Sequence, residues 1–320
     1  MQQRQPEKSY ESVLGFLKGK VKERFSQKVI YHYTSFRTFP VFFERNADLY
    51  CTHFAALNDG AEIRQGWEMA IRFLNNKFRW KNEKCNMLWR YYQRGILESK
   101  IVAPWIMSFS SAKDSLGQWI AYTDRVEGGY SLGFNFARLE MLLKRVACNV
   151  KKVTVDGEDG ARNKEIPYRL YVLPCLYSES DAGLIEELMM DYFGKEKSVF
   201  DRVRDSENPD NKDVAKIIAK LILVSSFVKH ESFKSEQEIR LIFQPLLLSY
   251  DACEFIGGKP RIKSKVAEYA NAELCSLLDE IWISPHGDTQ VLLSSAKIMA
   301  AKHGLNACKI EKSRSPYNGR

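Results

Sequence analysis

The stretch Phe233-Lys-Ser-Glu236-Gln-Glu238-Ile-Arg240-Leu-Ile-Phe243 places two carboxylates, one residue apart, at the start of an apolar run. From Glu238 onward the run is rich in branched and aromatic residues and ends before a proline, which predicts a β-strand. Because side chains alternate faces along a strand, Glu236, Glu238 and Arg240 would share one face. The simplest interpretation is an edge strand with a solvated polar face. The other is a functional site, because charges are costly to bury.

Length and composition limit the class of protein. A chain of 320 residues can form one large domain or two. No apolar run approaches the roughly 18 residues of a membrane span, and the first six residues lack the apolar segment of a signal peptide. Seven cysteines, never spaced Cys-x-x-Cys, indicate neither a zinc site nor a disulfide framework and predict a cytoplasmic protein. The net charge of +8 is compatible with an anionic partner but identifies none.

The predicted strands and helices follow no regular alternation, which is typical of an α+β fold. Strands are predicted at about 29–35, 48–54, 101–110, 130–136, 169–177, 238–243, 278–284 and 306–311, and helices at 36–45, 61–80, 83–99, 114–122, 137–146, 181–203, 211–231 and 288–303. We divide the chain into an N-terminal amphipathic helical arm at 1–28, a single α+β domain at 29–311 and a flexible tail at 312–320. The arm either packs on the domain, which is the simpler interpretation, or detaches to bind a partner protein.

Residues 72–100 form the most basic part of the chain and are also rich in aromatic residues. Eight basic side chains stand against only two glutamates, with six aromatic side chains interleaved. Basic side chains follow phosphates and aromatic rings stack on unpaired bases, which predicts a nucleic-acid surface. The alternative is two amphipathic helices with aromatic residues in the core and solvated basic residues. The candidate nucleic-acid-binding residues are Arg72, Lys77, Arg79, Lys81, Arg90 and Arg94.

Several short motifs occur in order along the chain. They are Tyr31-His32-Tyr33-Thr34-Ser35, Leu57-Asn58-Asp59 with Glu62, Ser108-Phe-Ser110, residues 119–122, Gly129-Tyr-Ser-Leu-Gly-Phe134 and Glu236-Gln-Glu238-Ile-Arg240. On these motifs the chain resembles a bacterial family of unknown function over about residues 29–311. Members of such families occur in phage-defence and toxin–antitoxin settings, so the resemblance implies a toxin.

The layout is also similar to that of the ADP-ribosyltransferases, whose signature is His, Tyr and Glu on three strands of a split β-sheet. The similarity implies that NAD is the substrate. Glu238 would stabilise the oxocarbenium-like cation that forms as the nicotinamide–ribose bond breaks. Glu236 would orient or deprotonate the acceptor, since two close carboxylates raise the pKa of one of them. Arg240 would pair with a pyrophosphate or, in the simpler case, with Glu236.

The same similarity implies a site for NAD among residues of the early strands. His32 would donate to a ribose hydroxyl, and Thr34, on the same face of its strand, would bond the adenosine half. Tyr50 would stack on nicotinamide, and Tyr122 is the competing residue for that role. The sequence contains no Gly-x-Gly-x-x-Gly loop, which disfavours a Rossmann mode of NAD binding.

These observations support three functions. The leading hypothesis is an NAD-dependent ADP-ribosyltransferase toxin of antiviral defence, with a nucleic acid (RNA preferred) as acceptor and a protein side chain as the alternative. Toxins that modify messenger RNA are the nearest analogy and imply an antitoxin and a SecB-like chaperone as partners, with the N-terminal helix as a candidate contact. The second hypothesis is a non-catalytic nucleic-acid-binding module. The third, a metal-dependent hydrolase or nuclease, is disfavoured by the lack of clustered acidic ligands.

Overall fold

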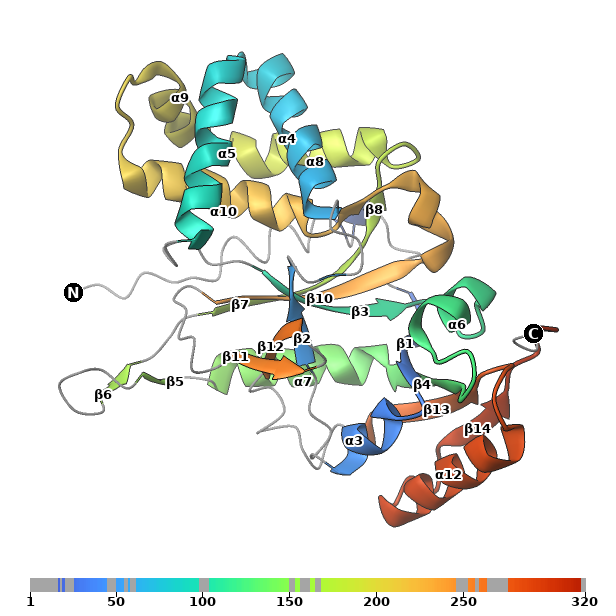
Figure 1. Cartoon of the computed structure of the whole chain (residues 1–320). Helices are drawn as coiled ribbons and strands as arrows, with labels where there is room; N and C mark the ends of the chain where they lie inside the picture. The colour runs from blue at the N-terminus through green and yellow to red at the C-terminus, as the bar shows by residue number, and fades with distance from the viewer. Residues whose placement is uncertain are drawn as a thin grey trace.

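The computed structural model of the chain describes residues 17, 19–20, 26–44, 50–54, 57, 62–97, 104–149, 153–155, 162–164, 168–245, 253–256, 259–263 and 276–317. In this part of the chain, helices surround a mixed sheet, which confirms the predicted α+β class. Figure 1 shows the sheet between an upper and a lower group of helices.

The elements are distributed as follows. The strands of the main sheet are β1 (Val29–Ser35), β2 (Tyr50–His53), β3 (Trp105–Ser110), β4 (Gly129–Asn135), β7 (Tyr168–Pro174), β10 (Glu238–Pro245), β11 (Cys253–Ile256), β12 (Lys259–Lys263), β13 (Leu278–Ile283) and β14 (Lys309–Lys312). Two short pairs are β5 (Val153–Val155) with β6 (Arg162–Lys164), and β8 (Leu176–Tyr177) with β9 (Val228–Lys229). The helices are α3 (Thr38–Glu44), α4 (Glu62–Phe78), α5 (Asn82–Leu97), α6 (Leu116–Tyr122), α7 (Phe136–Asn149), α8 (Ala182–Gly194), α9 (Lys197–Asp205), α10 (Asn211–Ser225), the 3-10 helix η2 (Glu231–Glu236) and α12 (Thr289–Lys302).

The main sheet divides at β3. Strand β10 pairs with one edge of β3 over the whole length of β3. Strands β1 and β2 therefore share the other edge of β3. Strand β1 pairs at one end of that edge, with Tyr31 opposite Ser110, and β2 pairs at the other end, with Thr52 opposite Ile106. One branch continues through β4, β13 and β14, and the other through β12 and β11. The two strands that leave one edge of β3 therefore open a split in the sheet.

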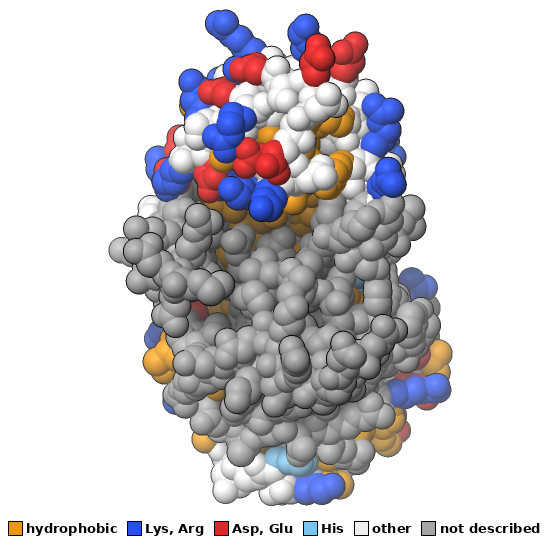
Figure 2. All heavy atoms as spheres, turned by 90° about the vertical axis from the view of Figure 1, so that its left-hand side faces the viewer, with side chains coloured by type: hydrophobic (Ala, Val, Ile, Leu, Met, Phe, Trp, Pro, Cys, Tyr) orange, Lys and Arg blue, Asp and Glu red, His pale blue; other side chains and the backbone are white. Residues whose placement is uncertain are grey.

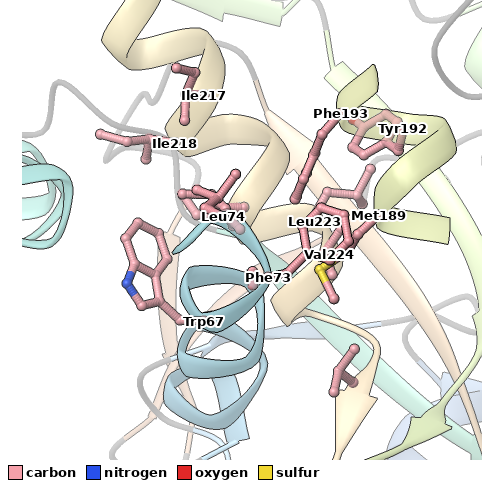
Figure 3. Close-up of a cluster of buried hydrophobic side chains, with 14 of the residues drawn as sticks. Trp67, Phe73, Leu74, Met189, Tyr192, Phe193, Ile217, Ile218, Leu223 and Val224 are labelled. Atoms are coloured by element: carbon pink, nitrogen blue, oxygen red, sulfur yellow. The ribbon is translucent and has the colours of Figure 1, made fainter. Parts of the chain in front are cut away.

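The upper helices form their own core over one face of the sheet. Figure 3 shows side chains from α4, α8 and α10 meeting there, among them Trp67, Phe193 and Val224. Ile106 of β3 and Ile242 of β10 belong to the same buried cluster. Because these two residues have the parity of Ser110 and Glu238, the upper layer covers the face of the sheet that carries the acid motif.

The opposite face packs on α3, α7 and α12. Its buried cluster contains Phe39 of α3, Leu139 of α7 and Leu292 of α12 together with Phe109 of β3 and Leu241 of β10. Each central strand therefore carries apolar residues on this face, and both faces of the sheet are covered by helices (Figure 1).

The two ends of the chain are attached to the domain where the structure describes them. Leu17 is fully buried in the upper core and Lys20 pairs with Glu187 at 2.8 Å, as expected for a helix that packs on the domain. Most of the other residues of the predicted arm lie outside the described residues. The expected flexible tail is held at Arg314, whose backbone N–H donates to Asp114 Oδ2 at 2.8 Å.

Gly66 permits the closest approach between α4 and α10. A Cβ atom at this position would lie 2.5 Å from Ser225 Cα. We expect Gly66→Ala to destabilise the protein by roughly 1–3 kcal/mol, because α10 must shift. Gly183→Ala on α8 is the control, since nothing lies within 4 Å of its Cβ, and alanine should stabilise a helix by up to about 1 kcal/mol. Urea unfolding of both variants tests this, and equal midpoints would contradict the close packing.

Candidate functional site

The acid motif lies on an interior strand. β10 pairs with β3 on one side and with β7 on the other. Glu238 is 5% exposed and Arg240 is 1% exposed. The interpretation as an edge strand with a solvated polar face is therefore wrong. Buried charges of this kind persist only when oppositely charged partners neutralise them.

A lysine from another strand bridges the two glutamates. Lys229, the last residue of β9, is 2% exposed, and its Nζ donates to Glu236 Oε2 and to Glu238 Oε2, each at 2.7 Å. The ammonium also lies 4.7 Å from the ring centroid of Phe233 in η2. The two carboxylates thus meet at one nitrogen atom.

Arg240 completes the cluster from the same strand as Glu238. Its Nε donates to Glu238 Oε1 at 2.9 Å and its Nη2 donates to Glu238 Oε2 at 3.0 Å, a bidentate pair. Its Nη1 donates to the carbonyl of Ser226 at 2.8 Å. Arg240 therefore pairs with Glu238, a partner that the sequence prediction did not include.

These cations keep Glu238 ionised. Burial would raise the pKa of this carboxyl, but the Arg240 guanidinium and the Lys229 ammonium outweigh burial and lower it to about 2. The backbone N–H of Glu238 donates to Tyr177 Oη at 3.0 Å, and burial raises the pKa of that phenol. Glu238 is consequently a carboxylate, and Tyr177 a neutral phenol, at neutral pH.

Glu236 is not part of the strand. The prediction that Glu236, Glu238 and Arg240 share one face of a strand is therefore wrong for Glu236. It ends η2, and Gln237 between the glutamates has φ 45° and ψ 48°, in the left-handed region. Ser110 Oγ donates to the carbonyl of Glu236 at 2.6 Å, which anchors this turn to β3. Such strained backbone needs support from its surroundings and often occurs at functional sites. The Glu236 side chain remains 18% exposed, so it is the acid that solvent reaches.

His32 lies beside the split, on the opposite face of the sheet from Glu238. Tyr31, Ser110 and Glu238 are in register across β1, β3 and β10, so they share a face and His32 faces the other way. The His32 ring lies 5.8 Å from that of Phe109, and its Nδ1 is 3.0 Å from the carbonyl of Ser108. Because a carbonyl only accepts, Nδ1 is the donor of this hydrogen bond. The hydrogen bond from His32 to a ribose hydroxyl stays a prediction.

The other predicted NAD-site residues are distributed over both faces. Thr34 is buried and shares the face of His32. Tyr122 ends α6 and packs against a cluster that contains Tyr31, so it lies on the face of Glu238. Tyr50 belongs to β2, but its side chain lies outside the described side chains. Tyr122 therefore lies on the side of the acid motif, and the choice between the two tyrosines for nicotinamide stays open.

Four of the six aromatic residues of the basic segment are core residues. Phe73, Phe78, Trp80 and Tyr92 are each at most 6% exposed, and they cannot stack on bases. All six candidate basic side chains are exposed on or next to α4 and α5. Lys77 pairs with Glu186 at 2.6 Å, and Figure 2 shows acidic side chains among the basic ones on the upper layer. Burial removes these four aromatic residues from contact with bases, whereas Trp89 and Tyr91 are only partly buried. Nucleic-acid binding by this segment stays a prediction.

Metal-binding groups and membrane spans are both absent from the residues that the structure describes. Among the residues that the structure describes, no group of His, Cys, Asp or Glu side chains could hold a metal ion. In the acid cluster the Lys229 ammonium occupies the place between the carboxylates that a metal ion would need. No helix within the described ranges is long and apolar enough to cross a membrane.

Sequence reasoning missed Lys229 and Tyr177. Lys229 comes shortly after α10, which ends at Ser225, and lies on a strand of two residues that is too short to show a periodicity. The available signal was a single charge at the end of a long apolar run, since such a charge is buried only with a partner. Tyr177 carried no signal of this kind.

The fold and the site thus define the class of protein: an α+β protein with a split sheet and a buried cluster of Glu238, Lys229 and Arg240. Residues 118–241 match a family described as protein of unknown function (DUF2971). The matched region runs from α6 to β10, a shorter span than the expected 29–311, and includes Tyr122, Lys229, Glu236, Glu238 and Arg240. No curated protein and no solved structure matches the chain.

Proposed function

We propose that this protein is an NAD-dependent ADP-ribosyltransferase that uses the acid pair of β10 and η2. The observation that carries the proposal is the acid pair itself: two cations hold Glu238 ionised beside the partly exposed Glu236. Strands β1, which bears His32, and β10, which bears Glu238, pair with the two edges of β3 at the same end. Their backbones are separated by two strand spacings, roughly 10 Å. A ligand on the acid face would meet Glu236 and Glu238, whereas the His32 side chain lies on the opposite face of the sheet.

The chemistry assigned to the pair follows from its ionisation. Breaking the bond between nicotinamide and ribose develops positive charge on the sugar. Glu238, held as a carboxylate by Arg240 and Lys229, supplies a fixed negative charge for that transition state. Glu236, which solvent reaches, takes the proton of the acceptor. Tyr122, on the same face, is the candidate for stacking on nicotinamide.

RNA is the proposed acceptor, now on charge alone. Arg79, Lys81 and Arg90 are exposed and form no ion pair with a described residue, so they are available to phosphates. The upper layer that carries them covers the same face of the sheet as the acid motif. In this proposal the protein is a toxin whose acceptor binds across that layer.

Incubation with labelled NAD, RNA and cell protein tests the function. We expect NAD consumption and label in RNA, with Glu236→Gln lowering the rate by about 10²–10⁴-fold through loss of the general base. Glu311→Gln, at an exposed position on β14, is the matched control and should keep full activity. If the label appears in protein alone, the acceptor is a protein and not RNA. No NAD consumption with either acceptor present would refute the transferase.

A further inference from the structure

Lys229 is a buried cation whose position is explained by the two carboxylates that it joins. We propose that Lys229 is a positioning residue, which holds Glu236 beside Glu238 and keeps both ionised for the reaction. This inference rests on the proposed function for its purpose, but its physical content, a lysine that sets the ionisation of an acid pair, can be measured without NAD.

The geometry distinguishes the parts that Lys229 and Arg240 have in the cluster. Arg240 already contacts both oxygens of Glu238, at 2.9 and 3.0 Å, so Glu238 has a complete partner on its own strand. Lys229 adds the contact to Glu236, which lies in a different element, η2. Its ammonium is therefore the link by which the partly exposed acid is held against the buried one.

The aromatic contact of Lys229 acts in the same direction. Phe233 lies in the first half of η2 with its ring centroid 4.7 Å from Nζ, while Glu236 ends that helix. The 3-10 helix η2 thus contacts the Lys229 ammonium with the ring of Phe233 and the carboxylate of Glu236. Each contact favours the charged form of the amine. A neutral side chain of similar length at 229 would keep the volume and lose both attractions.

The charges facing the pair predict what removal of Lys229 does. Lys229 comes from β9, Arg240 from β10 and the neutral Tyr177 from β8. Two carboxylates and two cations give a cluster of no net charge. Without the lysine, two close carboxylates share one guanidinium, and the like charges must raise the pKa of one acid. Because Arg240 binds Glu238, the acid expected to take up the proton is Glu236.

The deciding experiment is a carboxyl NMR titration of Lys229→Met and wild type, with Glu236 assigned by its loss in Glu236→Gln. We expect Glu236 to titrate at least one pH unit higher in Lys229→Met, and Lys229→Arg, which keeps the charge, to stay near wild type. The acid limb of NAD consumption should move by the same amount, about tenfold in rate at the lower pH. An unshifted Glu236 titration overturns the proposal.

The result can be separated from that of the proposed function. If wild type consumes no NAD, the transferase fails while the titration still decides the role of Lys229. If Lys229→Met does not fold, the ¹⁵N signal of the Lys229 ammonium is followed in wild type and in Glu236→Gln. We expect it to move with the Glu236 titration in wild type only. An ammonium signal that is indifferent to Glu236 would overturn the proposal by this route.

Discussion

Arg240→Met is expected to destabilise the protein by roughly 3–5 kcal/mol, because it removes one partner of a buried ion pair and leaves the other without its guanidinium. Arg240 is 1% exposed, and its guanidinium contacts the buried Glu238 carboxylate and the Ser226 carbonyl. The methionine fills most of the volume, so the loss arises mainly from the unpaired Glu238 carboxylate and the Ser226 carbonyl. Such a loss is a large part of the 5–15 kcal/mol typical of a domain.

Urea unfolding at neutral pH measures the effect of Arg240→Met. Arg90→Met is the matched control, because Arg90 is exposed on α5 and should change stability by less than about 0.5 kcal/mol. Arg240→Lys should fall between the two, since it keeps the charge but not the bidentate geometry. If Arg240→Met unfolds at the same urea concentration as Arg90→Met, the buried pair does not stabilise the fold.

Local patterns in the sequence predicted most elements of the fold. The helix predicted at 61–80 corresponds to α4, and the strand predicted at 29–35 corresponds to β1. Both rest on side chains within a few residues of each other, whose spacing a single stretch of sequence displays. The same spacing does not say which helix a face packs on, so the aromatic residues of α4 and α5 were open to a second interpretation.

The site was less predictable because it depends on strand register. Whether His32 and Glu238 share a face is decided by the pairing of Tyr31 with Ser110 and of Ser110 with Glu238, and a slip of one residue would reverse the answer. Nothing local in the sequence fixes those pairings, since the three strands are separated by long connections. The partner of the acid pair was hidden for the same reason, as Lys229 comes from another strand.

The pH dependence of Glu238→Gln is expected to show that the charge of this residue, and not its shape, stabilises the protein. Glutamine is nearly isosteric with glutamate but neutral, so Lys229 and Arg240 would keep their positions and lose most of their neutralising charge. We expect a loss of roughly 3–5 kcal/mol at pH 7. The folded-state pKa of Glu238 is lowered from 4.5 to about 2 by these two cations, which outweigh its burial.

A depressed carboxyl pKa fixes the sign of the pH effect. The stabilisation is fully present above the unfolded pKa near 4.5 and is lost as the pH falls through the folded pKa of about 2. The difference between wild type and Glu238→Gln should therefore be constant from pH 7 to 5 and should shrink between pH 4.5 and 2. Urea midpoints at pH 7, 5, 3.5 and 2.5 follow this, with Glu311→Gln as the exposed control. A difference that stays the same down to pH 2.5 would mean that glutamine perturbs packing, and that the Glu238 charge does not hold the ion cluster together.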